Sequence, residues 1–200
     1  MLGMKPGKKI VTIRCNNNKT DFYIEVVDGE YPHSELQVDP KFSKKPPKRV
    51  TKERKAIKKA FKRGAKQRLW TKPFVRPSEG VISGLFGGKR LFNGNLKSRH
   101  RGLDLYAEPG NPIVATNDGI VTLVADDFYF VGNAVFIDHG DGLFSMYFHM
   151  TETKVKTGDK VARGQLIGTI GSTGRVTGPH LHFGTKLKNT YFNPLGLPDI

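Results

Sequence analysis

Short runs of β-branched and aromatic residues, separated by tight turns, dominate the chain between residues 112 and 170. Five runs stand out: Pro112–Thr116, Gly119–Val124, Ala134–Asp138, Leu143–Phe148 and Gln165–Ile170. Asp-Gly or Gly-Asp pairs lie beside several of them. Runs of this length and composition predict strands, and Asp-Gly pairs favour tight hairpin turns. Because no long amphipathic pattern interrupts the series, the sequence predicts a mostly β fold built on an antiparallel sheet.

The charge of the chain is lopsided. Residues 1–75 contain 20 Lys and Arg against 7 Asp and Glu, a net charge of +13, whereas residues 76–200 contain 13 against 11, a net charge of +2. Such an asymmetry indicates regions with different roles. We therefore expect a small N-terminal β module, or a fragment of one, over residues 1–45. A basic helical linker is expected over residues 46–72, followed by a separate β domain over residues 73–200.

Residues 41–72 carry 15 basic side chains and a single acidic one, Glu53. Pro46-Pro47 is expected to end any structure there, and a helix is expected from Thr51, whose hydroxyl suits an N-cap. A thin apolar stripe then follows at helical spacing, formed by Ala56, Ile57, Ala60 and Phe61. One interpretation is a solvated linker helix that packs by this stripe; the other is a contact surface for an anionic polymer or lipid head groups.

Composition excludes several kinds of site. The single cysteine, Cys15, excludes an intrachain disulfide and a cysteine-based zinc site, so any metal site must use histidine and carboxylate ligands. No apolar run is long enough to span a bilayer, so we expect no transmembrane segment. The first nine residues lack the apolar stretch of a secretory signal.

Two histidine motifs are candidates for metal chemistry, His100-Arg-Gly-Leu-Asp104 and His180-Leu-His182, and His149 lies at the end of a predicted strand. Alternate residues of a strand face the same side, so His180 and His182 should point together. Even spacing on a strand would likewise put His100 and Asp104 on one face. Two imidazole nitrogens and one carboxylate oxygen would form a zinc site with an open fourth position, as catalytic zinc requires. Spacing alone does not separate such a site from surface polar residues, or say which half of His-x-His binds metal.

A longer series of motifs runs in order from Phe74 to Pro194: Ser83–Gly87 with Arg90, His100–Asp104, Pro112–Ala115, Gly132–Gly140, Tyr147–His149, Val155–Val161, Gly171–Gly174 and Thr177–Phe183. This series resembles the lysostaphin/LytM-type family of zinc metallopeptidases, of the murein DD-endopeptidase kind found in Gram-negative bacteria. The resemblance covers about 120 residues. It implies a LytM-like peptidase domain over residues 73–200, with a β-sheet groove and zinc at its floor.

The resemblance also implies the site residues. It assigns one Zn²⁺ per chain to His100, Asp104 and His182, and makes His149 and His180 the catalytic pair. It leaves His139 outside the catalytic set, as a structural residue. Zinc would lower the pKa of a water molecule towards neutrality, and a histidine would take the proton because no glutamate base is apparent near the motifs.

The substrate implied by the resemblance is the peptide part of bacterial peptidoglycan. An N-terminal β module followed by a basic helix favours the D-alanyl-diaminopimelate cross-link of Gram-negative walls. A glycine-bridge endopeptidase is one alternative, and a non-catalytic LytM-like activator of a cell-wall amidase is another.

The remaining expectations concern partners and compartment. No nucleic acid partner is expected, because the basic residues cluster in the linker and no nucleic-acid-binding motif accompanies them. An anionic envelope surface is the partner proposed for residues 41–72. The substrate places the protein in the bacterial cell envelope, in the periplasm, with a signal or anchor removed from the present sequence. The sequence does not indicate which oligomeric state the protein adopts.

Overall fold

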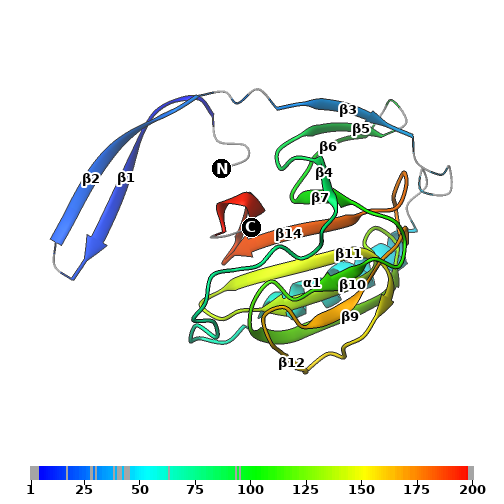
Figure 1. The fold of residues 1–200 in the computed structure, drawn as a ribbon. Coiled ribbons are helices and arrows are strands. Elements are labelled where there is room, and N and C mark those ends of the chain that lie inside the picture. Colours follow the sequence, from blue (N-terminus) through cyan, green and yellow to red (C-terminus); the bar gives the residue numbers. More distant parts are fainter. Residues whose placement is uncertain are drawn as a thin grey trace.

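A computed structural model describes residues 5–16, 18–27, 29, 31–37, 39, 42, 46–62, 64–92, 94 and 96–197. Its centre is a ten-stranded antiparallel sheet (Figure 1). The main path of this sheet runs in the order β12 (Lys160–Val161), β9 (Gly119–Phe128), β10 (Gly132–Asp138), β11 (Leu143–Thr153), β14 (Leu181–Leu187), β7 (Leu103–Tyr106) and β4 (Val81–Gly84). Three further strands join at its sides: β8 (Pro112–Val114), β13 (Leu166–Ile170) and β15 (Thr190–Phe192). A short 3-10 turn, η2 (Pro194–Gly196), follows. The predicted mostly β, antiparallel fold is confirmed.

The two faces of the central sheet have different tasks. On β14, Leu181 and Phe183 are fully buried and join a cluster that includes Tyr147 of β11. His182 lies between them in sequence and therefore projects from the opposite face, as alternation in a strand requires. Phe148 of β11 pairs with His182 and shares this second face. One face thus builds the core, while the other carries the candidate site.

The helix α1 (Pro47–Lys62) covers another part of the second face, behind β9 to β11 in Figure 1. Ile57 and Phe61 pack against a buried cluster of the sheet that includes Phe136 and Met146, so the predicted apolar stripe packs as expected. The expected start at Thr51 is wrong, because the helix begins at Pro47. A proline fits the first helical position since its missing N–H would have no partner there.

Glu53 joins α1 to the turn between β9 and β10. Its Oε2 accepts a hydrogen bond from the Tyr129 backbone N–H at 2.9 Å, and its Oε1 accepts one from Arg49 at 2.7 Å. Arg49 also pairs with Asp127 at 3.1 Å. The single acidic residue of the basic stretch is therefore a buried link between helix and sheet.

A second, three-stranded sheet lies above β7 and β14 in Figure 1 and consists of β3 (His33–Leu36), β5 (Lys89–Phe92) and β6 (Leu96–Arg99). Here β3 pairs with β5 in parallel, whereas β5 and β6 are antiparallel. A hairpin of β1 (Gly7–Cys15) and β2 (Asn18–Val26) lies apart from the rest of the chain in the same view. The division into an N-terminal module, a linker and a peptidase domain stays a prediction. Strand β3, from the predicted module, pairs with β5 of the predicted peptidase domain.

Among the described residues, no helix is both long and apolar enough to cross a membrane.

Candidate metal centre

The second sheet and the exposed face of the central sheet enclose a groove of about 840 Å³. The five site residues predicted from sequence all line it: His100, Asp104, His149, His180 and His182. No glutamate lines the groove among the described residues. The groove thus gathers side chains that lie up to 82 residues apart in sequence.

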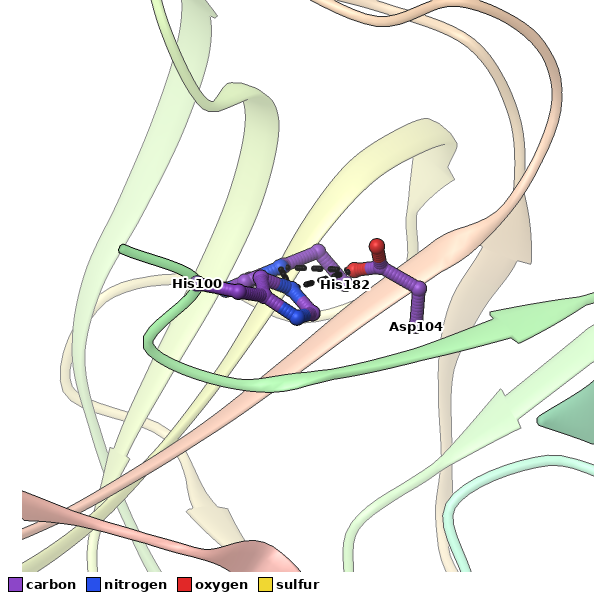
Figure 2. Close-up of side chains that lie close together, drawn as sticks. All are labelled: His100, Asp104 and His182. Carbon is purple, nitrogen blue, oxygen red and sulfur yellow. Dashed lines mark hydrogen bonds and ion pairs between the residues drawn. The ribbon is translucent and has the colours of Figure 1, made fainter. Parts of the chain in front are cut away.

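Three ligand atoms converge at the floor of this groove (Figure 2). Asp104 Oδ1 lies 2.8 Å from His100 Nε2 and 2.9 Å from His182 Nδ1, and the two nitrogens lie 2.9 Å from each other. Each of the three side chains therefore offers one ligand atom, and the three atoms surround a single position for a metal ion. Figure 2 shows His100 and Asp104 reaching this position from one segment, drawn in green, and His182 reaching it from β14.

Strand pairing positions two of the three ligands. Asp104 of β7 is the direct partner of His182 on β14, so both side chains leave the same face of the sheet. His100 follows β6 and lies outside any strand, and the chain turns back to β7 through Gly102. Even spacing on one strand is therefore not what brings His100 and Asp104 together; the turn at Gly102 does so instead.

This turn requires a glycine at position 102, because the space beside its Cα is filled by neighbouring atoms. A Cβ at residue 102 would lie 2.5 Å from the Phe183 carbonyl oxygen and 2.6 Å from His182 Nε2. Gly84 has a similar role on the other side, since a Cβ there would lie 2.6 Å from Asp104 Oδ2. Two glycines therefore allow the backbone to approach the ligand cluster closely.

Residues around the cluster hold the ligands in orientation. His100 Nδ1 donates to the Leu85 carbonyl oxygen at 2.8 Å, which leaves its Nε2 lone pair facing the cluster. Asp104 Oδ2 accepts from Arg90, so Oδ1 alone points at the histidines. The ring of Phe148 stacks on His182 with centroids 5.1 Å apart. Sequence reasoning noted Arg90 within a motif but gave it no task, and the carbonyl of Leu85 could not be identified from residue type.

The electrostatics of the cluster favour an ionised aspartate beside a neutral His182. Burial raises the pKa of Asp104, but the ring nitrogens of His100 and His182 against its carboxylate lower it by more, so the pKa of Asp104 lies far below its ordinary range. Burial lowers the pKa of His182 to about 4. Near neutral pH the cluster therefore offers a negative oxygen from Asp104 and a lone pair from the His182 imidazole.

His149 lies at an irregularity of β11. Up to Phe148 this strand pairs with β14, and from Met150 it pairs with β13. His149 itself has a φ of 68°, and the register with β10 shifts at the same place, which is a β-bulge. The expectation that His149 ends its strand is wrong, because β11 continues to Thr153. The bulge turns the side chain into the groove.

His149 and His180 face each other with ring centroids 4.9 Å apart. His149 Nδ1 donates to the Thr173 carbonyl oxygen at 2.8 Å, and His180 Nδ1 donates to the Gly178 carbonyl oxygen at 2.9 Å. Each ring thus keeps Nε2 free for the groove, and His180 Nε2 lies 3.8 Å from Asp104 Oδ1. Burial is the main cause that holds the pKa of His149 well below its ordinary value, so its Nε2 is an unprotonated base.

His139 is fully buried away from the groove. Its Nδ1 donates to the Asp118 carbonyl oxygen at 2.7 Å, and its Nε2 lies 2.7 Å from Ser145 Oγ. Both ring nitrogens therefore have partners inside the core.

The donor set fits a zinc ion. Zinc–nitrogen distances of about 2.0–2.1 Å in a tetrahedral site place ligand atoms about 3.3 Å apart, so separations of 2.8–2.9 Å need a small expansion. Two imidazoles and one carboxylate also leave a fourth position open towards the groove.

An antiparallel β groove with such a His–Asp–His cluster is the arrangement expected of a metallopeptidase. The chain belongs to peptidase family M23, which matches residues 98–194. A solved structure from Pseudomonas aeruginosa, described as a peptidase M23, is 30% identical and superposes with a TM-score of 0.72, over 96% of this chain and 73% of that one.

Two relatives from Vibrio cholerae have more specific names. The peptidoglycan DD-endopeptidase ShyC is 43% identical over 115 residues, which make up 56% of this chain and 26% of that protein. A solved structure described as a zinc-containing peptidase is 34% identical with a TM-score of 0.56, over 61% of this chain and 39% of that one. The chain spans about a quarter of the length of the curated relatives it matches.

Proposed function

We propose that this chain is a zinc-dependent endopeptidase that hydrolyses peptide cross-links of bacterial peptidoglycan. The observation that carries the proposal is the convergence of His100 Nε2, Asp104 Oδ1 and His182 Nδ1 at the floor of an open groove. In the proposal these three side chains hold one zinc ion per chain. When bound there, zinc would supply a Lewis acid that polarises the scissile carbonyl and lowers the pKa of a water molecule.

The chain's own histidines supply the proton transfer in this proposal. The Nε2 of His149 is unprotonated and faces the groove, so it can accept a proton from the attacking water. The Nε2 of His180 lies beside the cluster, and in the imidazolium form, with a proton on each ring nitrogen, it can donate a hydrogen bond to the negative oxygen of the tetrahedral intermediate. The Thr173 carbonyl fixes His149 in the tautomer that leaves its Nε2 unprotonated, and the Gly178 carbonyl orients the His180 ring through Nδ1.

The proposed bond is the D-alanyl-diaminopimelate cross-link. The support is the name of the relatives, since ShyC and ShyA are both peptidoglycan DD-endopeptidases. In the proposal the protein acts where this substrate lies, in the bacterial envelope and specifically in the periplasm.

Digestion of purified Gram-negative sacculi tests the proposal, with the released muropeptides resolved by mass. The wild-type protein should convert cross-linked dimers to monomers. His182→Ala and added chelator should each abolish this conversion, whereas His33→Ala, an exposed histidine outside the groove, should leave it unchanged. Unchanged dimers with a zinc-loaded wild-type protein would reject the proposed bond, and glycine-bridged walls would then test the glycine-bridge alternative.

The amidase-activator alternative makes a different prediction. An activator would leave sacculi intact by itself and would stimulate a purified cell-wall amidase even as the His182→Ala variant. An endopeptidase depends on the cluster for its own activity. The presence of all five site residues in one groove favours the endopeptidase.

We also propose that α1 contacts an anionic surface of the envelope. Its lysines 48, 52, 55, 58 and 59 are exposed, whereas its apolar stripe faces the sheet. Lys41, Lys44, Lys45 and Arg63 of the same basic stretch lie outside the described residues. Binding to sacculi that weakens steeply with salt, and weakens further when these five lysines are replaced by glutamine, is the expected result.

A further inference from the structure

The groove is strongly cationic. Four arginines line it, Arg90, Arg99, Arg101 and Arg175, whereas Asp104 is the only acidic residue among the described residues that line it. Asp104 is already engaged by Arg90 and by the histidines. The groove therefore presents excess positive charge to whatever enters it, which favours an anionic substrate.

The four arginines differ in the partners that their guanidinium groups already contact. Arg90 pairs with Asp104, and Arg99 donates to the Gly87 carbonyl oxygen at 3.3 Å. Arg101 is exposed and lies 5.4 Å from the centroid of the Tyr191 ring. Arg175 is half-buried, and no described residue accepts a hydrogen bond from its guanidinium.

Two aromatic rings hold the Arg175 side chain in place. Its Cζ lies 4.1 Å from the ring centroid of Phe92 on β5 and 4.8 Å from that of Phe130 in the β9–β10 turn. Its backbone N–H donates to the Phe130 carbonyl oxygen at 3.2 Å. Stacking uses the faces of a guanidinium and leaves the N–H groups at its edge free for an anion. The side chain is thus fixed before any ligand arrives.

The surroundings of Arg175 disfavour its positive charge unless an anion lies beside the guanidinium. Burial is the largest influence and lowers the pKa of Arg175; Tyr129 acts in the opposite direction, and the charge of Arg90 lowers the pKa further. A carboxylate beside the guanidinium would oppose the effects of burial and of Arg90. A fixed, partly desolvated guanidinium with free N–H edges suits bidentate binding of a carboxylate.

We propose that Arg175 binds a free carboxylate of the substrate peptide and so selects cross-linked peptides that carry one near the scissile bond. This inference rests on the proposed function, because it assigns a substrate group to the same groove. Arg175 follows the Gly171–Gly174 motif and precedes His180 on the same segment, so the wall of the groove that carries Arg175 also carries one of the two proposed catalytic histidines.

The test uses a synthetic cross-linked peptide dimer that contains the D-alanyl-diaminopimelate bond, and the same dimer with its free carboxylates converted to amides. Zinc-loaded wild-type protein should cleave the acid form with a kcat/KM about tenfold higher than the amide form. Arg175→Met, which keeps an unbranched side chain between the two rings, should lower kcat/KM for the acid form to the level of the amide form, through KM. Arg175→Lys keeps the charge without the planar fork and should restore part of the loss.

A control variant removes a positive charge far from the groove in sequence and outside the proposed binding surfaces. Arg14→Met changes an exposed arginine of β1 that does not line the groove, and should leave the cleavage of both substrates unaffected. If Arg175→Met lowers the activity on both substrates equally, Arg175 only links β5 to the β9–β10 turn and the proposal is wrong. No effect on either substrate also overturns it.

Binding measurements separate this inference from the proposed function. The affinity of the two dimers is measured by calorimetry in a His180→Ala background, in which we expect no cleavage. Acid-selective binding that Arg175→Met removes would support the inference even if the wild-type protein cleaved neither dimer. Cleavage by the wild-type protein without acid-selective binding would support the endopeptidase and reject the role of Arg175.

Discussion

Asp104 and His182 are direct partners in the antiparallel β7–β14 pair, and their side chains meet at 2.9 Å. The register of this pair therefore fixes the distance between two of the three proposed zinc ligands. His100 completes the cluster from a loop that Gly102 and the Leu85 carbonyl hold in place. The backbone pairing of the sheet thus positions two of the three proposed ligands.

Asp104→Asn should weaken zinc binding by more than about 100-fold, because it removes the only negative ligand at the proposed site. Competition with a chromogenic chelator measures the affinity without any need for activity. Asp126→Asn, an exposed aspartate on β9, is the matched control and should bind zinc as the wild type does. Equal affinities for Asp104→Asn and the wild-type protein would exclude this carboxylate as a ligand.

His149→Ala and His180→Ala should each retain about one zinc ion per chain and lose activity. Neither side chain contributes an atom to the ligand cluster, whereas both keep Nε2 free for proton transfer. Removal of a general acid or base lowers kcat by about 10²- to 10⁴-fold. Metal analysis of the purified variants, together with their rates on sacculi, separates the two properties. Loss of zinc from either variant would place that histidine among the ligands instead.

Gly102→Ala should both destabilise the fold and weaken zinc binding. The added methyl group would meet the Phe183 carbonyl oxygen at 2.5 Å, and backbone cannot move aside as a side chain can. Overpacking of this kind destabilises by roughly 1–3 kcal/mol. Urea denaturation and zinc competition measure the two effects. Gly196→Ala has no heavy atom within 4 Å of the new Cβ and should change neither.

Much of the groove was predictable because its parts leave signals in the sequence. Alternation places His182 on the opposite face from Leu181 and Phe183, and short β-branched runs predict the antiparallel sheet. The apolar stripe of α1 also packs against the sheet as its spacing predicts. These are local patterns, and strand or helix periodicity is enough to interpret them.

The remaining features depend on contacts that no local pattern records. The bulge at His149 arises where β11 exchanges β14 for β13 as its partner, and that exchange is a property of the whole sheet. The carbonyl groups that orient His100 and His149 belong to Leu85 and Thr173, and any residue type could supply them. The pairing of β3 with β5 brings together segments more than 50 residues apart, so sequence alone did not predict it.

His139 should make the stability of the protein depend on pH. Burial lowers its pKa to about 4 in the folded state, from an ordinary value of 6.5. The unfolded chain therefore takes up this proton at a higher pH than the folded chain does, so the stabilisation is complete above about pH 6.5 and is lost as the pH falls towards 4. Between pH 7 and pH 5 the loss from this one residue amounts to roughly 2 kcal/mol.

The comparison that isolates this contribution is between the wild-type protein and His139→Gln, both with chelator, by urea denaturation at pH 7 and pH 5. The histidines of the groove are the same in both proteins, so their contributions cancel in the difference. The wild-type protein should lose roughly 2 kcal/mol more than the variant over this interval. Since His139 is buried between the Asp118 carbonyl and Ser145, the variant is expected to be less stable at pH 7 but flatter in its pH dependence. Parallel pH profiles for the two proteins would show that His139 takes up its proton in the folded state as readily as in the unfolded one.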